Sequence, residues 1–162
     1  MWGRHKKAVL DAGARAPSFR LKNLGSAPVS LEEILSKGPA LLAFYKVSCP
    51  VCQLTFPFLE RLARSSSIQI IGISQDDLSA TEGFNQRFGV TFPTLLDQAK
   101  ESYPASNAFG ITNVPSMFLV EPDGHIASAF SGFSKRDLEA LGTRAGVTAF
   151  RADENVPEWK AG

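Results

Sequence analysis

The sequence predicts a single α/β domain with a mixed central sheet flanked by helices. Two buried apolar runs, at 40–45 and 68–73, alternate with helical patterns in the first half of the chain. Such alternation implies parallel crossovers. A strand pattern at 116–120 is followed by a Pro-Asp-Gly turn and a second strand pattern at 126–130, which predicts an antiparallel hairpin. Parallel and antiparallel neighbours therefore share one sheet.

The remaining elements follow from capping and turn signals. Ser30 and Ser79 each stand three residues before a glutamate, as in a capping box, and Ser134 precedes an amphipathic pattern. Two short strand patterns before residue 30 flank a turn, which predicts an N-terminal hairpin. The expected elements are strands at 17–22, 27–29 and 94–96, and helices at 30–38, 53–64, 79–89, 101–109 (interrupted by Pro104) and 135–144.

Length and charge limit the domain count and the class of partner. The chain has 162 residues, 44% of them hydrophobic and 20% charged, with a net charge of +1. This is ordinary composition for one globular domain with its own core. The near-zero charge gives no reason to expect nucleic acid or a membrane surface as a partner. We expect a loose leader at 1–12, a domain at 13–146 and a polar C-terminal tail at 147–162.

Apolar stretches bear on localisation. No run approaches the roughly 20 apolar residues of a membrane span, and no signal-peptide core follows the basic residues near the start. The sequence as given therefore predicts a cytoplasmic protein. A periplasmic or membrane-anchored location is the alternative if a signal segment has been removed.

The motif Cys49-Pro50-Val51-Cys52 contains both cysteines and lies between a buried strand and a helix. Residues three apart on a helix share a face, with their side chains about 5–6 Å apart. A small adjustment brings them to the Cβ separation of about 3.5–4.5 Å found in a disulfide. Unpaired N–H groups and the dipole stabilise a thiolate at a helix N-terminus. Thiol–disulfide chemistry is therefore predicted, with Cys49 attacking and Cys52 resolving the mixed disulfide.

Metal binding and purely structural cysteines fit the pattern less well. Zinc favours four ligands, and only His5 and His125 could join the cysteines, neither of them within a ligand pair. A copper carrier built from the cysteines and one histidine, and a pair of inert buried cysteines, are two further hypotheses. We expect no metal and no cofactor.

Stretches on both sides of the motif extend its context. Residues 13–21, Gly-Ala-Arg-Ala-Pro-Ser-Phe-Arg-Leu, are similar to the opening motif of the AhpC/TSA and Redoxin families. The strand, CxxC and proline-containing helix resemble thioredoxin. The segment leading to Val114-Pro115, the next strand and Asp123-Gly124 resemble the TlpA/ResA-like thiol–disulfide oxidoreductases. The resemblance covers about residues 13–142 and implies a thioredoxin-like fold with a peroxiredoxin/TlpA-type insertion.

The resemblance also implies partners and a docking site. Protein thiols and disulfides would be the substrates and a thioredoxin-type protein a candidate reductant. The sequence leaves the oligomeric state open, and a monomer is slightly favoured. Pro115 matches the family's cis-proline beside the CxxC, which leaves the Val114 backbone able to pair with an extended substrate. Pro50 and Val51 are assigned to the same docking surface.

Two positions depart from the resembling families. Ala43 stands where thioredoxins carry a buried aspartate, and Thr55 where TlpA/ResA-like proteins often carry a glutamate. These carboxylates assist proton movement at the buried cysteine. Tyr45, Lys46 and Thr55 are candidate supporting residues. Their competing interpretations are a core aromatic, a solvated charge and a hydroxyl bonded to its own helix.

Two different functions compete with thiol–disulfide exchange. A peroxiredoxin-like peroxidase would use Cys52 as the peroxidatic residue, with Cys49 in the family's Thr/Ser position and Tyr45 in its Pro position. A non-enzymatic thioredoxin-fold module that binds a partner or a metal is the third hypothesis.

Overall fold

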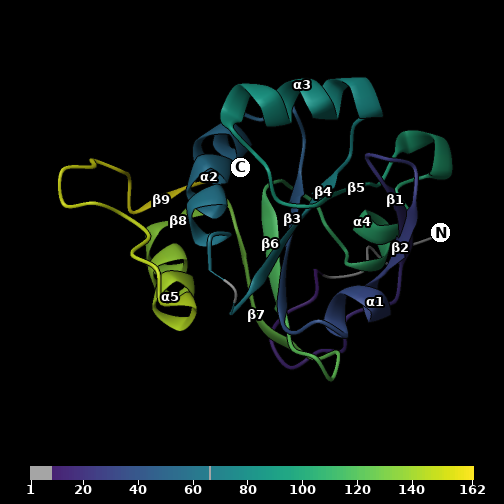
Figure 1. The fold of residues 1–162 in the computed structure, drawn as a ribbon, viewed down its shortest axis with the longest axis horizontal. Coiled ribbons are helices and arrows are strands. Elements are labelled where there is room, and N and C mark those ends of the chain that lie inside the picture. Colours follow the sequence, from purple (N-terminus) through teal and green to yellow (C-terminus); the bar gives the residue numbers. More distant parts are fainter. Residues whose placement is uncertain (1–8, 66) are drawn as a thin grey trace, which may run out of the picture.

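The computed structural model describes residues 9–65 and 67–162, which form a mixed seven-stranded sheet flanked by helices (Figure 1). The strand order is β2-β1-β5-β4-β3-β6-β7. β3 is parallel to β4 and antiparallel to β6, so the predicted mixed sheet is confirmed. The strands are β1 Arg20–Asn23, β2 Pro28–Ser30, β3 Ala40–Tyr45, β4 Gln69–Ser74, β5 Thr94–Leu96, β6 Ser116–Val120 and β7 Ile126–Ser131.

Helices cover both faces of the sheet. The helices are α1 Leu31–Leu35, α2 Pro50–Leu62, α3 Leu78–Phe88, the 3-10 turn η1 Ala99–Glu101, α4 Pro104–Ala108 and α5 Lys135–Ala145. Consecutive side chains of β3 point to opposite faces. Leu41 and Tyr45 pack under α2, α3 and α5, whereas Leu42 and Phe44 pack against α1 and α4. The whole of β3 is buried, so the strand that leads to the cysteines is fixed from both sides.

Local capping chemistry sets most helix starts. The Ser30 and Ser134 hydroxyls accept from the backbone N–H groups of Glu33 (3.1 Å) and Asp137 (3.3 Å), as predicted. The predicted cap of α3 was wrong. Asp77, not Ser79, caps this helix, because the Asp77 carboxylate lies two residues earlier and accepts from the Ala80 N–H at 2.8 Å.

The helix expected at 101–109 is split in two. α4 begins at Pro104. Proline has no N–H, and this costs no hydrogen bond because the first N–H groups of a helix have no intrahelical partner. The buried Asp97 carboxylate accepts from the next two N–H groups, of Ala105 at 2.9 Å and Ser106 at 2.7 Å. Proline and aspartate together therefore start a helix rather than interrupt one.

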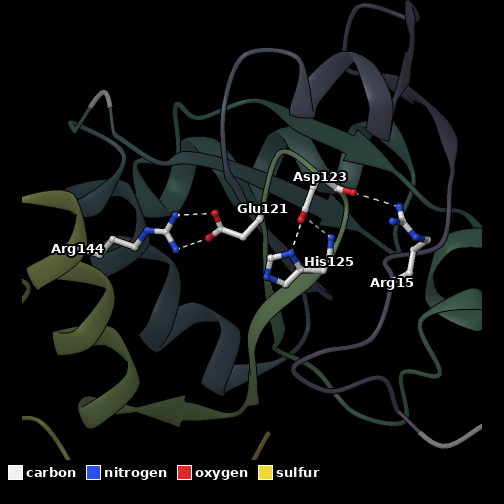
Figure 2. A network of polar contacts seen from close by, with 5 residues as sticks. All are labelled: Arg15, Glu121, Asp123, His125 and Arg144. Carbon is white, nitrogen blue, oxygen red and sulfur yellow. Dashed lines mark hydrogen bonds and ion pairs between the residues drawn. The ribbon is translucent and has the colours of Figure 1, made fainter.

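Polar contacts tie the N-terminal segment and α5 to the β6–β7 hairpin (Figure 2). Arg15 donates to the Asp123 carbonyl at 3.1 Å, and Arg144 pairs with Glu121. The pKa of Glu121 is lowered chiefly by the Arg144 guanidinium, and that of Asp123 by the His125 backbone N–H and ring. Of the expected leader, residues 1–8 lie outside the described residues.

The C-terminal tail is docked on the domain. The Phe150 ring lies 4.8 Å from the Phe58 ring, and Arg61 on α2 binds both carboxylate oxygens of Glu154, at 2.7 and 2.8 Å. The tail then loops outward and returns toward α2 (Figure 1). It ends in a strand that the sequence pattern did not show, β9 (Trp159–Lys160), which is antiparallel to β8 (Phe133–Ser134).

We expect the tail's ion pair to weaken in acid. Hydrogen bonds from Arg61 and from the Arg151 N–H lower the pKa of Glu154 from 4.5 to about 2. A lowered folded pKa contributes stability that is present above pH 4.5 and is lost as the pH falls toward 2. The free energy of unfolding of the wild type minus that of Glu154→Gln should therefore shrink across this window in urea titrations. A constant difference from pH 6 to 2 would contradict the assignment.

None of the helices within the described ranges is both long and apolar enough to cross a membrane.

Candidate active site

The sheet brings the two cysteines and the Val114–Pro115 segment to one edge. β3 ends at Tyr45 and leads into the cysteine motif, while the antiparallel β6 begins at Ser116, directly opposite Phe44. The residues that follow β3 and those that precede β6 are therefore neighbours in space, although they lie more than 60 positions apart in the chain.

Cys49 caps α2 through its sulfur. Its backbone is extended (φ −84°, ψ 113°), and its Sγ accepts from the Cys52 N–H at 3.2 Å. Pro50 occupies the first helical position. The sulfur thus takes the place that an oxygen holds in an ordinary N-cap. A thiolate at Cys49 keeps this N–H contact and gains the positive end of the helix dipole.

Cys49 also contacts the backbone of Val114. The thiol donates to the Val114 carbonyl oxygen across 3.5 Å. The Val114–Pro115 peptide bond is cis, as the resemblance implied. Loss of the Cys49 proton removes the donor to this carbonyl. The carbonyl then becomes an available acceptor directly beside the reactive sulfur.

Cys52 is the buried partner. Its side chain has no solvent exposure, whereas Cys49 is half-buried, and both are free thiols. Burial raises the pKa of the Cys52 thiol, and its contact with Cys49 raises it further. The two sulfurs are therefore chemically unequal, with the more accessible one at the helix start and the fully buried one in the first turn.

The loop that carries Cys49 is fixed from β4. The Asp76 carboxylate, just after β4, accepts from the Val47 N–H at 2.8 Å, and the Val47 carbonyl accepts from the Gln53 side chain at 3.1 Å. The Cys49 N–H in turn donates to the Lys46 carbonyl at 3.2 Å. These contacts hold the approach to α2 in one conformation.

One residue assigned to the docking surface has a buried side chain. Val51 is only 6% exposed and packs in the core cluster under α2, so its side chain is not on that surface. Pro50, one residue earlier, is exposed. Val114, which contacts Cys49, is half-buried, and Pro115 is buried.

The three supporting candidates differ in their surroundings. The Tyr45 hydroxyl donates to the Asn85 side chain at 2.8 Å, and burial raises the pKa of Tyr45. Thr55 donates to the Val51 carbonyl at 2.7 Å, as expected for a hydroxyl bonded to its own helix. Lys46 is exposed. The partner Asn85 carries no local sequence signal, so only the fold shows its role.

Across residues 9–65 and 67–162, no group of three or more His, Cys, Asp and Glu side chains is placed to hold a metal ion.

Curated proteins similar to this chain are named as thiol-disulfide oxidoreductases. The thiol-disulfide oxidoreductase ResA of Geobacillus kaustophilus is 26% identical over 139 residues, which is 83% of this chain and 78% of the relative. ResA of Bacillus subtilis is 25% identical over 130 residues, 78% of this chain and 70% of the relative.

Solved structures establish the fold. The thioredoxin domain of a thiol-disulfide oxidoreductase from Bacteroides vulgatus superposes with a TM-score of 0.73 at 21% identity, covering 83% of this chain and 97% of that one. The predicted thioredoxin-like fold is therefore confirmed. The AhpC/TSA family matches residues 12–129, nearly three quarters of the sequence. The chain belongs to the AhpC/TSA family.

Proposed function

We propose that this protein is a thiol–disulfide oxidoreductase that exchanges a Cys49–Cys52 disulfide with protein thiols. The observation that carries the proposal is the inequality of the two sulfurs. Cys49 is accessible and capped by the Cys52 N–H, whereas Cys52 is buried with a raised pKa. The similarity to ResA proteins supports the same function.

The exchange proceeds in two balanced steps. The Cys49 thiolate attacks one sulfur of a substrate disulfide, so that a Cys49–substrate disulfide forms and one substrate thiolate leaves. Cys52 then loses its proton and attacks the Cys49 sulfur. The Cys49–Cys52 disulfide forms, and the second substrate thiolate leaves with the two electrons that the protein has lost. The reverse sequence transfers the disulfide to a substrate dithiol.

A protein substrate would be held by its backbone. The Val114 carbonyl lies beside the Cys49 sulfur, where an N–H group of an extended chain can pair with it. A thioredoxin-type protein that presents its own dithiol could return the oxidised pair to the reduced state. Both partners follow from the chemistry of the site and are part of this proposal.

The peroxidase alternative is disfavoured by the position of Cys52. A peroxidatic cysteine must be reached by peroxide and must be a thiolate. Cys52 has no exposed surface, and burial raises its pKa. Tyr45, which stands at the position of the peroxiredoxin proline, donates its hydroxyl hydrogen bond to Asn85.

Reduction of insulin disulfides together with a dithiol redox titration tests the proposal. The wild type should catalyse insulin reduction, and the cysteine pair should titrate as one two-electron couple. Peroxide consumption that survives Cys49→Ser but not Cys52→Ser would favour the peroxidase. A protein inert in both assays, even though its pair oxidises, would favour the binding module.

A further inference from the structure

The end of the chain lies on the candidate docking site. Gly162 packs against Val114 so closely that a Cβ added at Gly162 would overlap the Val114 carbonyl oxygen and reach to 3.0 Å from Pro115 Cδ. The same carbonyl accepts from the Cys49 thiol. Gly162 and the reactive sulfur therefore both lie against this one carbonyl.

Backbone contacts hold residues 158–162, here named the terminal segment, in a defined register. Lys160 lies opposite Phe133 and Trp159 opposite Ser134 in the β8–β9 pair. The Glu158 carbonyl accepts from the Lys135 N–H at 3.0 Å. The terminal segment thus approaches Cys49 as an extended chain added to a strand edge, which is the geometry of peptide recognition by strand addition.

Gly132 shows how closely the terminal segment fits. Its N–H donates to the Pro115 carbonyl at 2.9 Å, and a Cβ on its other side would overlap the Lys160 carbonyl oxygen. Gly132 has φ +73°, a conformation that favours glycine. The residue that links β7 to β8 therefore lies between the docking segment and the chain that covers it.

The terminal segment is held more weakly than the tail before it. Upstream, Phe150 packs on Phe58, and Arg61 binds Glu154 through two hydrogen bonds. In the terminal segment, all five residues are exposed and Trp159 is 59% exposed, its ring N–H donating to the Ser131 carbonyl at 3.3 Å. Segments with little apolar burial open at low free-energy cost. The terminal segment can therefore leave while the tail stays anchored.

We propose that the terminal segment is an internal ligand of the substrate-docking site, which an extended protein substrate must displace before it reaches Cys49. This inference rests on the proposed function, since it concerns the substrate of that same site. The docking site holds peptide backbone in both states: that of the terminal segment before the substrate binds, and that of the substrate afterwards. Small disulfides reach the half-exposed sulfur without that displacement.

Gly162→Ala in the full chain tests the proposal, because the added methyl cannot coexist with the Val114 carbonyl. Gly83→Ala is the matched control, since a Cβ there meets nothing within 4 Å. We take the terminal segment to be displaced in about a tenth of the molecules. Displacing it in all of them then raises the apparent affinity for a protein substrate about tenfold. Gly162→Ala should show this gain with insulin and change the rate with hydroxyethyl disulfide less than about twofold. Trp159→Ala should act in the same direction.

Alkylation provides a readout that does not need exchange activity. A maleimide on a polyethylene glycol chain should modify Cys49 faster in Gly162→Ala than in the wild type or Gly83→Ala, while iodoacetamide should not distinguish the three. Unchanged insulin rates and unchanged alkylation in both tail variants would overturn the proposal, with the proposed function intact if the wild type still exchanges. If no variant exchanges any disulfide, the proposed function fails and the alkylation ratio still decides where the terminal segment lies.

Discussion

Replacing Cys49 with serine should reduce insulin turnover to the uncatalysed rate, a loss on the order of 10³-fold or more, as expected when an enzyme loses its nucleophile. The reason is positional. Cys49 is the half-exposed sulfur at the start of α2, and the fully buried Cys52 cannot replace it in the first step. Turnover followed by turbidity or by thiol release measures the effect.

Cys52→Ser is the matched variant, and it should behave differently. The first step should proceed at a rate close to that of the wild type, because Cys49 keeps its contact with the backbone N–H at position 52. The mixed disulfide should then accumulate to one equivalent, detectable by mass spectrometry of the intact adduct. Accumulation on Cys52 in Cys49→Ser instead would reverse the assigned roles.

Thr55→Glu should accelerate resolution of the mixed disulfide at neutral pH by on the order of 10²-fold, the lower end of what a positioned acid–base group contributes. Thr55 is fully buried and follows Cys52 by three residues on α2, so the two side chains share a helix face. Burial raises the pKa of Cys52, so we expect loss of its proton to limit the second step. A carboxylate at position 55 would accept that proton.

The pH profile separates this effect from a general change in structure. In the wild type, single-turnover resolution should rise about tenfold per pH unit up to the raised pKa of Cys52, because only the thiolate attacks. Thr55→Glu should flatten this rise, whereas Thr55→Gln, of similar shape, should keep it. Chemical denaturation checks that both variants fold, since each loses the hydroxyl bond to the Val51 carbonyl. A folded Thr55→Glu with wild-type kinetics would contradict the account.

The sequence predicted a strand or a helix start correctly where neighbouring residues alone determine it. The uninterrupted apolar run of β3 and the serine caps at Ser30 and Ser134 act through immediate neighbours, and the structure has them as predicted. The start of α3 was not decided in this way, because Asp77 and Ser79 are both good caps. Only the geometry at the end of β4 selects Asp77.

Long-range contacts were the part that the sequence could not show. β9 is two residues long, too short for any periodicity, and it exists because Phe133–Ser134 offers it an edge. The burial of the Val51 side chain was hidden from the sequence for a related reason. Its inward position depends on how α2 packs, which the CxxC spacing does not specify. Both features concern the surroundings of Cys49 rather than the cysteines themselves.

The path of the tail has a practical consequence for anyone who handles this protein. The close packing of Gly162 against Val114 means that residues fused after position 162 emerge beside Cys49. A C-terminal purification handle would crowd the reactive thiol or lift the terminal segment away from it, and either change would alter measured rates. Rates measured with such a handle should therefore be compared with rates measured after its removal.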